Sequence, residues 1–239
     1  MTFIQLEPRR AVRAACILAN DPDDLPQVFT IIESLSMNTL QRIADRMQKS
    51  PSGRRMLESR PDIVDILADR AALARMPEGS LGRAYLAFVE SENISAAGIR
   101  DAATKGMTHT ANIPAPLDWV HARMRDTHDL WHAATGYAGD VVGEMGLLGF
   151  TLAQTHNPGI AFLLSIGISK TFHAKVGDGS ESRRVIADGF RRGKKAAWLA
   201  DQEWEALLPL QLAEVRRRLE LDAPPVYTQL RSAEIKAAA

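Results

Sequence analysis

The sequence predicts an all-α protein that folds as a single multi-helix domain over residues 1–239. Apolar residues recur three or four positions apart along most of the chain, which is the helical period, and the two-residue alternation of strands does not occur. Proline and glycine clusters separate these periodic segments. A composition of 46% hydrophobic and 24% charged residues is ordinary for a globular domain. The alternative division is a small N-terminal helical unit, ending near Met76, that packs on the rest.

Helices in the first part of the chain are delimited by capping residues and prolines. Asn38 is placed to cap a helix that residues 51–53, with a proline and a glycine, are expected to end. Pro61 is a favourable first residue for the next helix. Residues 76–79 break the chain, and Ser80 is placed to cap the following helix. The apolar side chains expected on the inner faces of these helices are Leu40, Ile43, Met47, Ile63, Ile66, Leu67, Ala71, Leu81, Tyr85, Phe88 and Val89.

The middle of the chain is expected to hold a loop followed by two helices. Residues 98–114 are poor in large apolar groups, which indicates a loop. Pro116 begins a long helix that runs to about Thr135. The two glycines in 136–139 end this helix, and Asp140 is placed to cap the next one.

The last part of the chain is predicted from further breaks. Residues 157–159 form a turn, and the glycine-rich 177–180 segment separates an apolar stretch from a basic amphipathic helix. The final helix, over about 201–219, contains Pro209 and is expected to kink there. The tail with two prolines at 224–225 is expected to be extended.

Charge and cysteine content narrow the possible functions. The 29 basic and 29 acidic residues give a net charge of zero, which removes the bulk electrostatic case for binding nucleic acid. Cys16 is the only cysteine, so an internal disulfide and a cysteine-rich metal site are excluded and a reducing compartment is favoured. The chain opens on no secretory signal, and no stretch reaches the ~18 apolar residues of a spanning helix. We therefore expect a cytoplasmic protein that is soluble or lies on a membrane surface, and a bacterial source.

One stretch of the chain lacks basic residues but keeps its acids. Residues 126–169 contain neither Lys nor Arg, and they hold four acids and three histidines. His128 and His132 are one helical turn apart at the border of an apolar face, with Asp129 beside them. Two such imidazoles can bind a single divalent ion. The same spacing also fits two histidines that only pack.

Glu144 favours the metal interpretation. It lies on an apolar face of the second helix, where an unpaired carboxylate costs roughly several kcal/mol. The glycine break at 136–139 allows this helix to fold back, so that Glu144 faces His128 and His132. A shared divalent cation would then neutralise the carboxylate, and zinc, iron and manganese each suit such ligands.

This spacing resembles that of a known family. The segment HDLWH over 128–132, followed by eleven residues and Glu144, resembles the H-D-x-x-H-x11-E signature of the Coq4 family of ubiquinone (coenzyme Q) biosynthesis proteins. Residues 76–85 are similar to its P-E-G-T-x-G-R-x-Y element, with Ser80 in place of the threonine. The similarity continues through 120–154, which holds the two central helices.

The resemblance also includes a C-terminal element. Residues 204–219 are similar to that element, so the family-like region covers about 25–221 and the tails are peripheral. The implied fold is mostly helical, with a metal-binding helix pair and an apolar groove for a polyprenyl tail. A homodimer is also implied.

The resemblance implies a divalent metal ion on His128, Asp129, His132 and Glu144, which are therefore also the expected catalytic residues. The implied reaction removes the ring carboxylate of a polyprenyl-hydroxybenzoate-type precursor and hydroxylates the same carbon. The family is also expected to organise the other ubiquinone biosynthesis enzymes, in peripheral association with the inner membrane. The alternative is a non-catalytic scaffold that binds polyprenyl lipid. A zinc hydrolase is less favoured, because Asp129 is shorter than the general-base glutamate of H-E-x-x-H.

Three further features each have two interpretations. His121 lies either beside the metal site or, as an ordinary structural histidine, in the core or on the surface. Small residues on the second helix allow either close helix packing or room for a ligand chain; they are Gly143, Gly146, Gly149 and Ala153. A basic cluster forms either a solvated face or a contact for anionic lipid head groups; it consists of Arg183, Arg184, Arg191, Arg192, Lys194 and Lys195.

Overall fold

The computed structural model describes residues 6–21, 24–36, 38–95, 98, 101, 103–105, 113–173, 179–231 and 233. This part of the chain is helical without any strand, and an isolated antiparallel bridge joins Ser80 to Gln211. The prediction of an all-α fold is confirmed. None of the helices described combines the length and the apolar character that crossing a bilayer requires.

The helices differ greatly in length, from single turns to four or more turns. Their bounds are α1 Pro8–Asn20, α2 Leu25–Leu35, α3 Thr39–Met47, α4 Pro51–Ser59, α5 Val64–Ala68, α6 Arg70–Arg75, α7 Leu81–Ser91, α9 Leu117–Asp126, α10 His128–Thr135, α11 Val141–Thr155, α12 Pro158–His173, α13 Gly179–Lys195, the 3₁₀-helix η2 Leu199–Asp201, α14 Trp204–Leu207 and α15 Leu212–Arg218.

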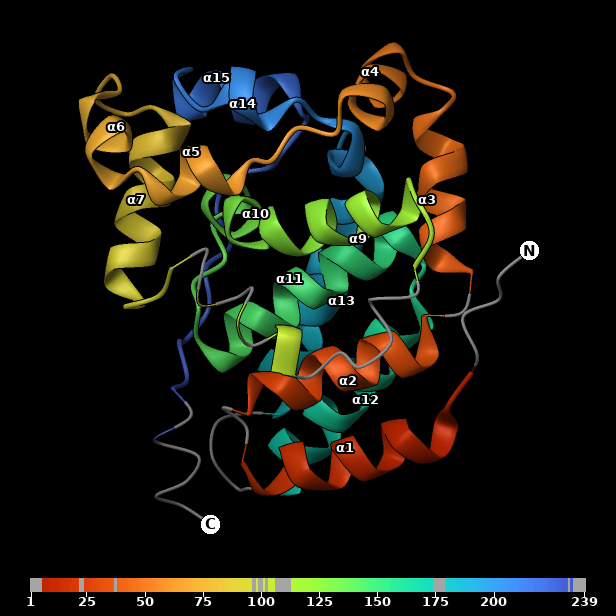
Figure 1. Cartoon of the computed structure of the whole chain (residues 1–239). Helices are drawn as coiled ribbons and strands as arrows, with labels where there is room; N and C mark the ends of the chain where they lie inside the picture. The colour runs from red at the N-terminus through yellow and green to blue at the C-terminus, as the bar shows by residue number, and fades with distance from the viewer. Residues whose placement is uncertain are drawn as a thin grey trace.

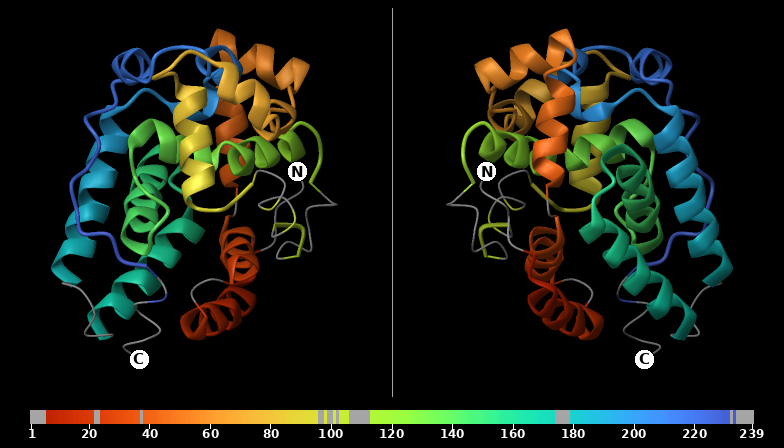
Figure 2. Two further views of the ribbon diagram at one scale, coloured as in Figure 1. Left: turned by 90° about the vertical axis from the view of Figure 1, so that its left-hand side faces the viewer. Right: turned by 90° about the vertical axis from the view of Figure 1, so that its right-hand side faces the viewer.

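The helices form layers around a central pair (Figure 1). Helices α9 and α10 cross the middle of the molecule, with α1, α2 and α12 below them and α4, α14 and α15 above. The side views show α11 running alongside α13 (Figure 2), and these two helices make the most extensive contact in the fold. The largest fully buried side chains of the main core come from α7, α10, α11, α14 and the turn after α10; they are Tyr85, Trp131, Tyr137, Phe150 and Trp204.

Two prolines of the first part start or precede a helix in ways that differ from the prediction. Pro51 does not end a helix: it begins α4, and the Ser50 hydroxyl accepts a hydrogen bond from the Gly53 amide as the cap. Proline is suited to a first turn because its missing N–H would be unpaired there anyway. The helix expected from Pro61 begins only at α5, and the Asp69 side chain caps a separate α6. The inward placement of Ala71 is also wrong, because this residue is exposed.

Other boundaries also differ from the prediction. Gly98, Asp101 and residues 103–105 are helical, so the loop expected over 98–114 is wrong there, and most of its remainder lies outside the described residues. The long helix expected from Pro116 is interrupted at Thr127, between α9 and α10. The final helix is three short pieces, η2, α14 and α15, rather than one kinked helix. The caps by Ser80 and Asp140 are confirmed, and residues 224–225 belong to no helix or strand. The break expected at 177–180 falls partly outside the described residues, and α13 begins at Gly179.

The small residues of α11 serve helix packing. A Cβ atom added at Gly149 would lie 2.5 Å from the Ile186 carbonyl oxygen of α13. A Cβ added at Gly146 would meet the Tyr137 ring at 2.4 Å and a Val185 methyl group at 2.8 Å. Of the two interpretations of these glycines, close approach of two helices is therefore the one that the packing supports.

The basic cluster on α13 is only in part a solvated face. Arg192 is buried, its guanidinium lies 4.9 Å from the Tyr137 ring centroid, and it donates a 2.8 Å hydrogen bond to the Thr135 carbonyl. Arg191 and Lys195 form ion pairs with Asp222 in the tail. Arg192 therefore holds the C-terminal end of α10 against α13, and it is not available to lipid head groups.

Candidate metal centre

The two helices of the site are joined by a tight turn that the sequence specifies. Helix α10 ends at Gly136, which adopts the left-handed conformation with φ 84°, and its amide donates to the His132 carbonyl. Glycine takes this conformation at little cost, so the chain reverses direction there. Asp140 then caps α11 by accepting hydrogen bonds from the amides of Val142 and Gly143. The first turn of α11 carries Glu144, which is thereby directed back toward α10.

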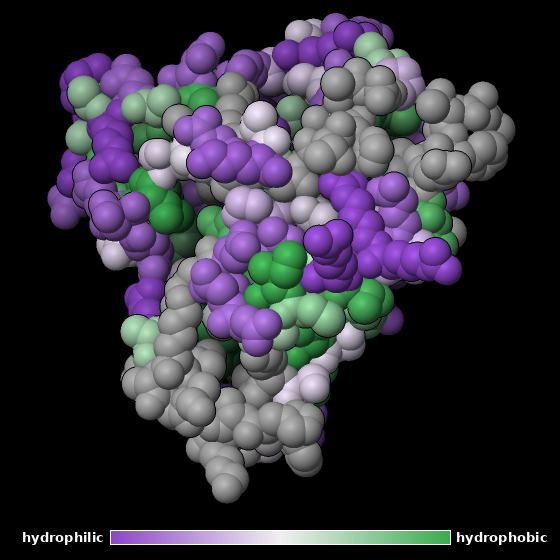
Figure 3. Space-filling view, turned by 60° about the horizontal axis from the view of Figure 1, so that its bottom comes forward, coloured by the Kyte–Doolittle hydropathy of each residue, from purple (hydrophilic) through white to green (hydrophobic). Residues whose placement is uncertain are grey.

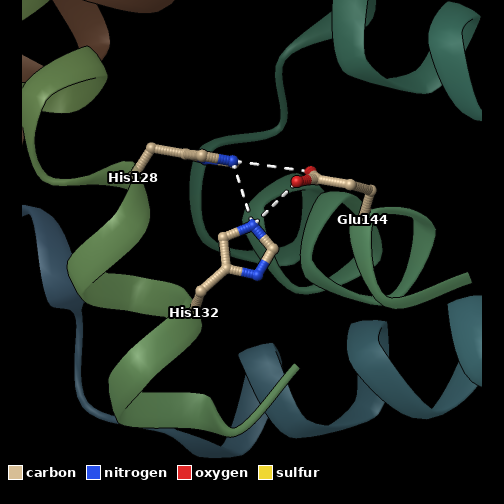
Figure 4. A group of neighbouring side chains, drawn as sticks. All are labelled: His128, His132 and Glu144. Atoms are coloured by element: carbon tan, nitrogen blue, oxygen red, sulfur yellow. Dashed lines mark hydrogen bonds and ion pairs between the residues drawn. The ribbon is translucent and has the colours of Figure 1, made fainter. Parts of the chain in front are cut away.

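His128, His132 and Glu144 converge on one point (Figure 4). Each offers one ligand atom, and these atoms all lie within 4.8 Å of one another. The Nε2 atoms of the two histidines are 3.2 Å apart. Glu144 places Oε1 3.1 Å from Nε2 of His132 and Oε2 3.5 Å from Nε2 of His128. The glycine break between the helices thus achieves the arrangement that a continuous helix would prevent.

The orientation of the His132 ring is fixed from two sides. Its Nδ1–H donates a 3.0 Å hydrogen bond to the Tyr137 carbonyl, since a carbonyl can only accept. The Phe88 ring of α7 stacks on it with a centroid separation of 4.8 Å and an interplanar angle of 14°. With Nδ1 protonated, the neutral ring presents the lone pair of Nε2 to the other two side chains. Such a carbonyl partner is the usual means of setting tautomer and direction in a metal-binding histidine.

The imidazole of His132 and the carboxylate of Glu144 stabilise each other's charged forms. Burial alone would lower the pKa of His132, but the Glu144 carboxylate and the Tyr137 carbonyl outweigh it, and the pKa is raised. Burial alone would raise the pKa of Glu144, but the neighbouring imidazoles of His132 and His128 hold it below its usual range. Three lone-pair donors directed at one point require a proton or a cation between them.

The donor set suits a divalent transition metal. Two imidazoles and one carboxylate form the three-ligand set of many catalytic zinc sites, and they also form the facial triad of non-haem iron enzymes. The His132 side chain is fully buried, whereas those of His128 and Glu144 are 33% and 42% exposed. An ion held by these three residues would therefore keep one side open to an incoming ligand, as catalytic sites require and structural sites do not.

Asp129 is not one of the three converging residues. Its side chain is buried, and Oδ2 has no hydrogen-bond partner among the described residues. Burial raises its pKa, while the nearby His128 and His132 oppose that effect. Burial is the main cause of the raised pKa of Tyr85 on α7, and the negative charge of Asp129 raises it further. The charge of Asp129 therefore affects Tyr85 as well as the two histidines. Its place in the ligand set stays a prediction.

Other titratable residues near the site have local roles. Asp126 is buried and accepts hydrogen bonds from Arg125. His121 is half-buried on α9, and burial together with Arg125 lowers its pKa to about 4, so this ring is neutral near pH 7. Neither side chain belongs to the converging group.

Phe88 and Tyr137 contact His132 in the structure, and the sequence alone does not indicate either contact. Phe88 was expected only as part of an apolar stripe, and Tyr137 only as part of a break. The one local signal for Tyr137 is its position directly after the glycine that reverses the chain, which returns its carbonyl to the preceding turn. No local signal exists for Phe88, because α7 is distant in sequence.

A family model matches most of the chain. The model described as coenzyme Q (ubiquinone) biosynthesis protein Coq4 matches residues 9–225. This range begins earlier than the family-like region of about 25–221 expected from the motifs, because it also includes α1 from its second residue onward.

Curated relatives carry the same description. The human protein named ubiquinone biosynthesis protein COQ4 homolog, mitochondrial, is 26% identical over 224 residues, covering 92% of this chain and 79% of that protein. The Aspergillus clavatus protein named ubiquinone biosynthesis protein coq4, mitochondrial, is 28% identical over 200 residues, covering 80% of this chain and 64% of that protein. Both relatives are longer than the part that this chain matches.

A solved structure has the same fold. A crystal structure of a Nostoc punctiforme protein, proposed to act in ubiquinone biosynthesis, superposes with a TM-score of 0.66 at 24% identity. The match covers 92% of this chain and 100% of that one. At this identity the likeness extends to the helical architecture, which agrees with the all-α prediction.

Proposed function

Since this chain belongs to the Coq4 family of coenzyme Q (ubiquinone) biosynthesis proteins, we propose that it acts on a polyprenyl-hydroxybenzoate-type precursor of the quinone ring. The proposed reaction replaces the ring carboxylate with a hydroxyl group. The observation that supports it most is the convergence of His128, His132 and Glu144 at a position with one open side.

The three converging residues would hold the divalent metal ion. A redox-active ion such as iron would supply oxygen activation, and any divalent ion would bind the substrate carboxylate. His132 and its Tyr137 carbonyl partner fix the buried side of the site. His128 and Glu144 form the exposed side, where a ring carboxylate would approach.

The reaction balances with dioxygen as the oxidant. The bond between the ring carbon and the carboxyl carbon breaks, and the carboxyl group leaves as carbon dioxide. A carbon–oxygen bond forms at the same ring carbon, and the product is a phenol. This exchange is a two-electron oxidation of the substrate, so one atom of dioxygen enters the product, and the other is reduced to water by two electrons and two protons from an external reductant.

Apolar side chains beside Glu144 support the proposal of a polyprenyl tail. Leu148 and Leu152 follow Glu144 at intervals of four residues on α11, so all three share a face of the helix. Both leucines are half-buried, as is Phe88 on the other side of the site. An apolar surface next to one polar end suits an isoprenoid with a charged head group.

Turnover tests the proposed reaction directly. Purified protein loaded with Fe²⁺ and supplied with a prenylated hydroxybenzoate, ¹⁸O₂ and ascorbate as the two-electron reductant is expected to yield the labelled phenol, detected by mass spectrometry. His128→Ala should lose more than about 100-fold of this activity, since it removes a metal ligand while leaving the exposed side of the fold intact. His156→Asn, at an exposed histidine outside the site, is the matched control. Retention of the lipid without product by the wild type would instead indicate the non-catalytic scaffold.

A membrane surface is a further proposed partner, and α1 rather than α13 has the better face for it. Among the residues that the structure describes, four of the five exposed large apolar side chains lie between residues 6 and 25: Val12 and Ile17 on α1, Leu6 just before it and Leu25 at the start of α2. Exposed arginines at 9 and 13 alternate with them on α1. On this side of the molecule, hydrophobic side chains reach the surface among hydrophilic ones (Figure 3). Such a mixed face fits the head-group region of an anionic bilayer.

Flotation with vesicles tests this contact. Wild-type protein is expected to float with vesicles rich in phosphatidylglycerol at low salt. Val12→Glu combined with Ile17→Glu should reduce the partition constant by about 10-fold or more, since two aliphatic side chains no longer enter the bilayer. Val226→Glu changes an equally apolar residue that is 88% exposed in the tail, and it should float like the wild type. Equal flotation of the double variant and the wild type would refute the assignment to α1.

The proposed partners also include the other ubiquinone biosynthesis enzymes and a second copy of this chain. A role in ubiquinone biosynthesis entails such enzymes, because each step receives the product of another. The homodimer rests on the family resemblance.

A further inference from the structure

The segment after α15 lies across the turn that joins the two helices of the site. Asp222 in this segment forms an ion pair with Lys195 of α13. Pro224 packs against Gly136, where an added Cβ would lie 2.7 Å from the proline Cβ. Arg231, near its end, forms an ion pair with Glu92 just after α7. This tail segment, residues 222–231, is therefore fixed at several points along its length.

Tyr227 is the residue of the tail segment that contacts the turn most closely. Its hydroxyl donates a 3.0 Å hydrogen bond to Oδ2 of Asp140 and accepts one of 3.0 Å from the Ala138 amide. Its ring lies 6.4 Å from the Tyr137 ring. Burial and the Asp140 carboxylate raise the pKa of Tyr227, so the hydroxyl keeps the proton that it donates.

The backbone of the tail segment completes the same network. Leu230 donates its amide to Oδ1 of Asp140 at 3.0 Å, and its carbonyl accepts from the Val141 amide at 2.9 Å. Asp140 is buried, and both of its carboxylate oxygens are bound by the tail segment. The residue that caps α11 is therefore itself held by residues about ninety positions later in the sequence.

The turn between α10 and α11 determines the geometry of the metal site. The Tyr137 carbonyl orients His132, and it lies directly before Ala138, which Tyr227 binds. The Asp140 carbonyl accepts the Glu144 amide at 2.8 Å, which sets the first turn of α11. The Tyr227 hydroxyl therefore binds the turn between Tyr137, whose carbonyl orients His132, and α11, which carries Glu144.

We propose that Tyr227 is a positioning residue for the metal centre: its hydroxyl bridges Ala138 and Asp140 and so keeps His132 and Glu144 at metal-binding distance. This inference rests on the proposed metal site. Tyr227 lies just beyond residues 9–225, the range that the family model matches. It does not itself touch the ion.

Metal affinity of Tyr227→Phe tests the proposal. Phenylalanine keeps the ring but can form neither hydrogen bond. We expect the dissociation constant for Co²⁺ to rise by about 10-fold, as for other partners that orient a metal ligand. The metal-free variant should melt only a few degrees below the wild type, because Asp140 keeps its hydrogen bonds from the amides of Val142, Gly143 and Leu230. Val226→Ala, at the exposed neighbouring position, should bind Co²⁺ like the wild type.

An unchanged Co²⁺ affinity in Tyr227→Phe would overturn the proposal, as would a fall in melting temperature without any loss of affinity. If the wild type binds neither Co²⁺ nor Zn²⁺, the metal centre itself is refuted. The positioning role is then decided in the metal-free protein by ¹⁵N spectra of the His132 ring. A tautomer or exchange difference between the wild type and Tyr227→Phe supports it, and identical spectra refute it.

Discussion

Protein purified with Glu144 replaced by alanine is expected to retain almost no divalent metal, whereas the wild type retains about one ion for each chain. Glu144 supplies the only carboxylate among the three converging ligands, and the two imidazoles that remain are neutral donors. Even residues that merely orient a ligand account for about 10- to 100-fold in metal affinity. Removing a ligand should therefore raise the dissociation constant by more than about 100-fold.

Elemental analysis and calorimetric titration with Zn²⁺, Fe²⁺ and Mn²⁺ check this expectation. Glu144→Gln is the sharper variant, because it keeps the size of the side chain and removes its charge. Glu58→Ala, at an exposed glutamate on α4, controls for the loss of an acidic residue. A full complement of metal in both Glu144 variants would mean that the ion lies elsewhere. If the wild type binds none of these ions, a proton shared between Glu144 and His132 would explain why these side chains converge.

The converging residues were accessible to sequence analysis because their geometry is local. Two histidines four positions apart on a helix share a face whatever the tertiary structure. Glu144 could be included because a carboxylate on an apolar face needs a partner, and the glycines at 136–139 allowed the helix to reverse. Asp129 was included because it lies beside the two histidines in a stretch without basic residues and because it matches the family signature, and it is not among the three residues that converge.

The contacts that fix these ligands were not accessible, because they join distant segments. Phe88 stacks on His132 from a helix some forty residues earlier, and Tyr227 binds the turn from the tail. Neither contact follows from a pattern along the chain. Helix boundaries were likewise predictable only where local contacts set them. Ser80 and Asp140 cap their helices as predicted, through hydrogen bonds to nearby amides. The division of the last segment into η2, α14 and α15 depends instead on what they pack against, such as the Gln154 side chain that accepts from the Leu199 amide.

The contact between α11 and α13 is where a single methyl group should have the largest effect on stability. Gly189 of α13 faces α11 so closely that an added Cβ would lie 2.1 Å from the Gly146 carbonyl oxygen. Gly193, one turn later, would place a Cβ 2.4 Å from the Phe150 carbonyl oxygen. These neighbours are backbone atoms, so no side-chain rotation can relieve the overlap, and the two helices must separate.

Gly189→Ala is therefore expected to lower the free energy of unfolding by about 3 kcal/mol, at the upper end for overpacking. This loss exceeds the gain of about 1 kcal/mol that alanine brings to a helix interior. Urea unfolding followed by circular dichroism measures the difference. Gly98→Ala is the matched control, since it adds the same methyl group at an exposed helical position where the nearest atom, the Ser95 hydroxyl, is 3.3 Å away. Gly98→Ala should be neutral or slightly stabilising.

The same substitution should also weaken metal binding. The Gly146 carbonyl that Gly189 approaches lies only two residues beyond Glu144 on α11, so a displaced α11 carries Glu144 away from His128 and His132. Gly193→Ala, which displaces α11 near Phe150, should destabilise the fold to a similar degree with a smaller loss of Co²⁺ affinity. Unfolding free energies of Gly189→Ala and the wild type that agree within about 0.5 kcal/mol would contradict this close packing.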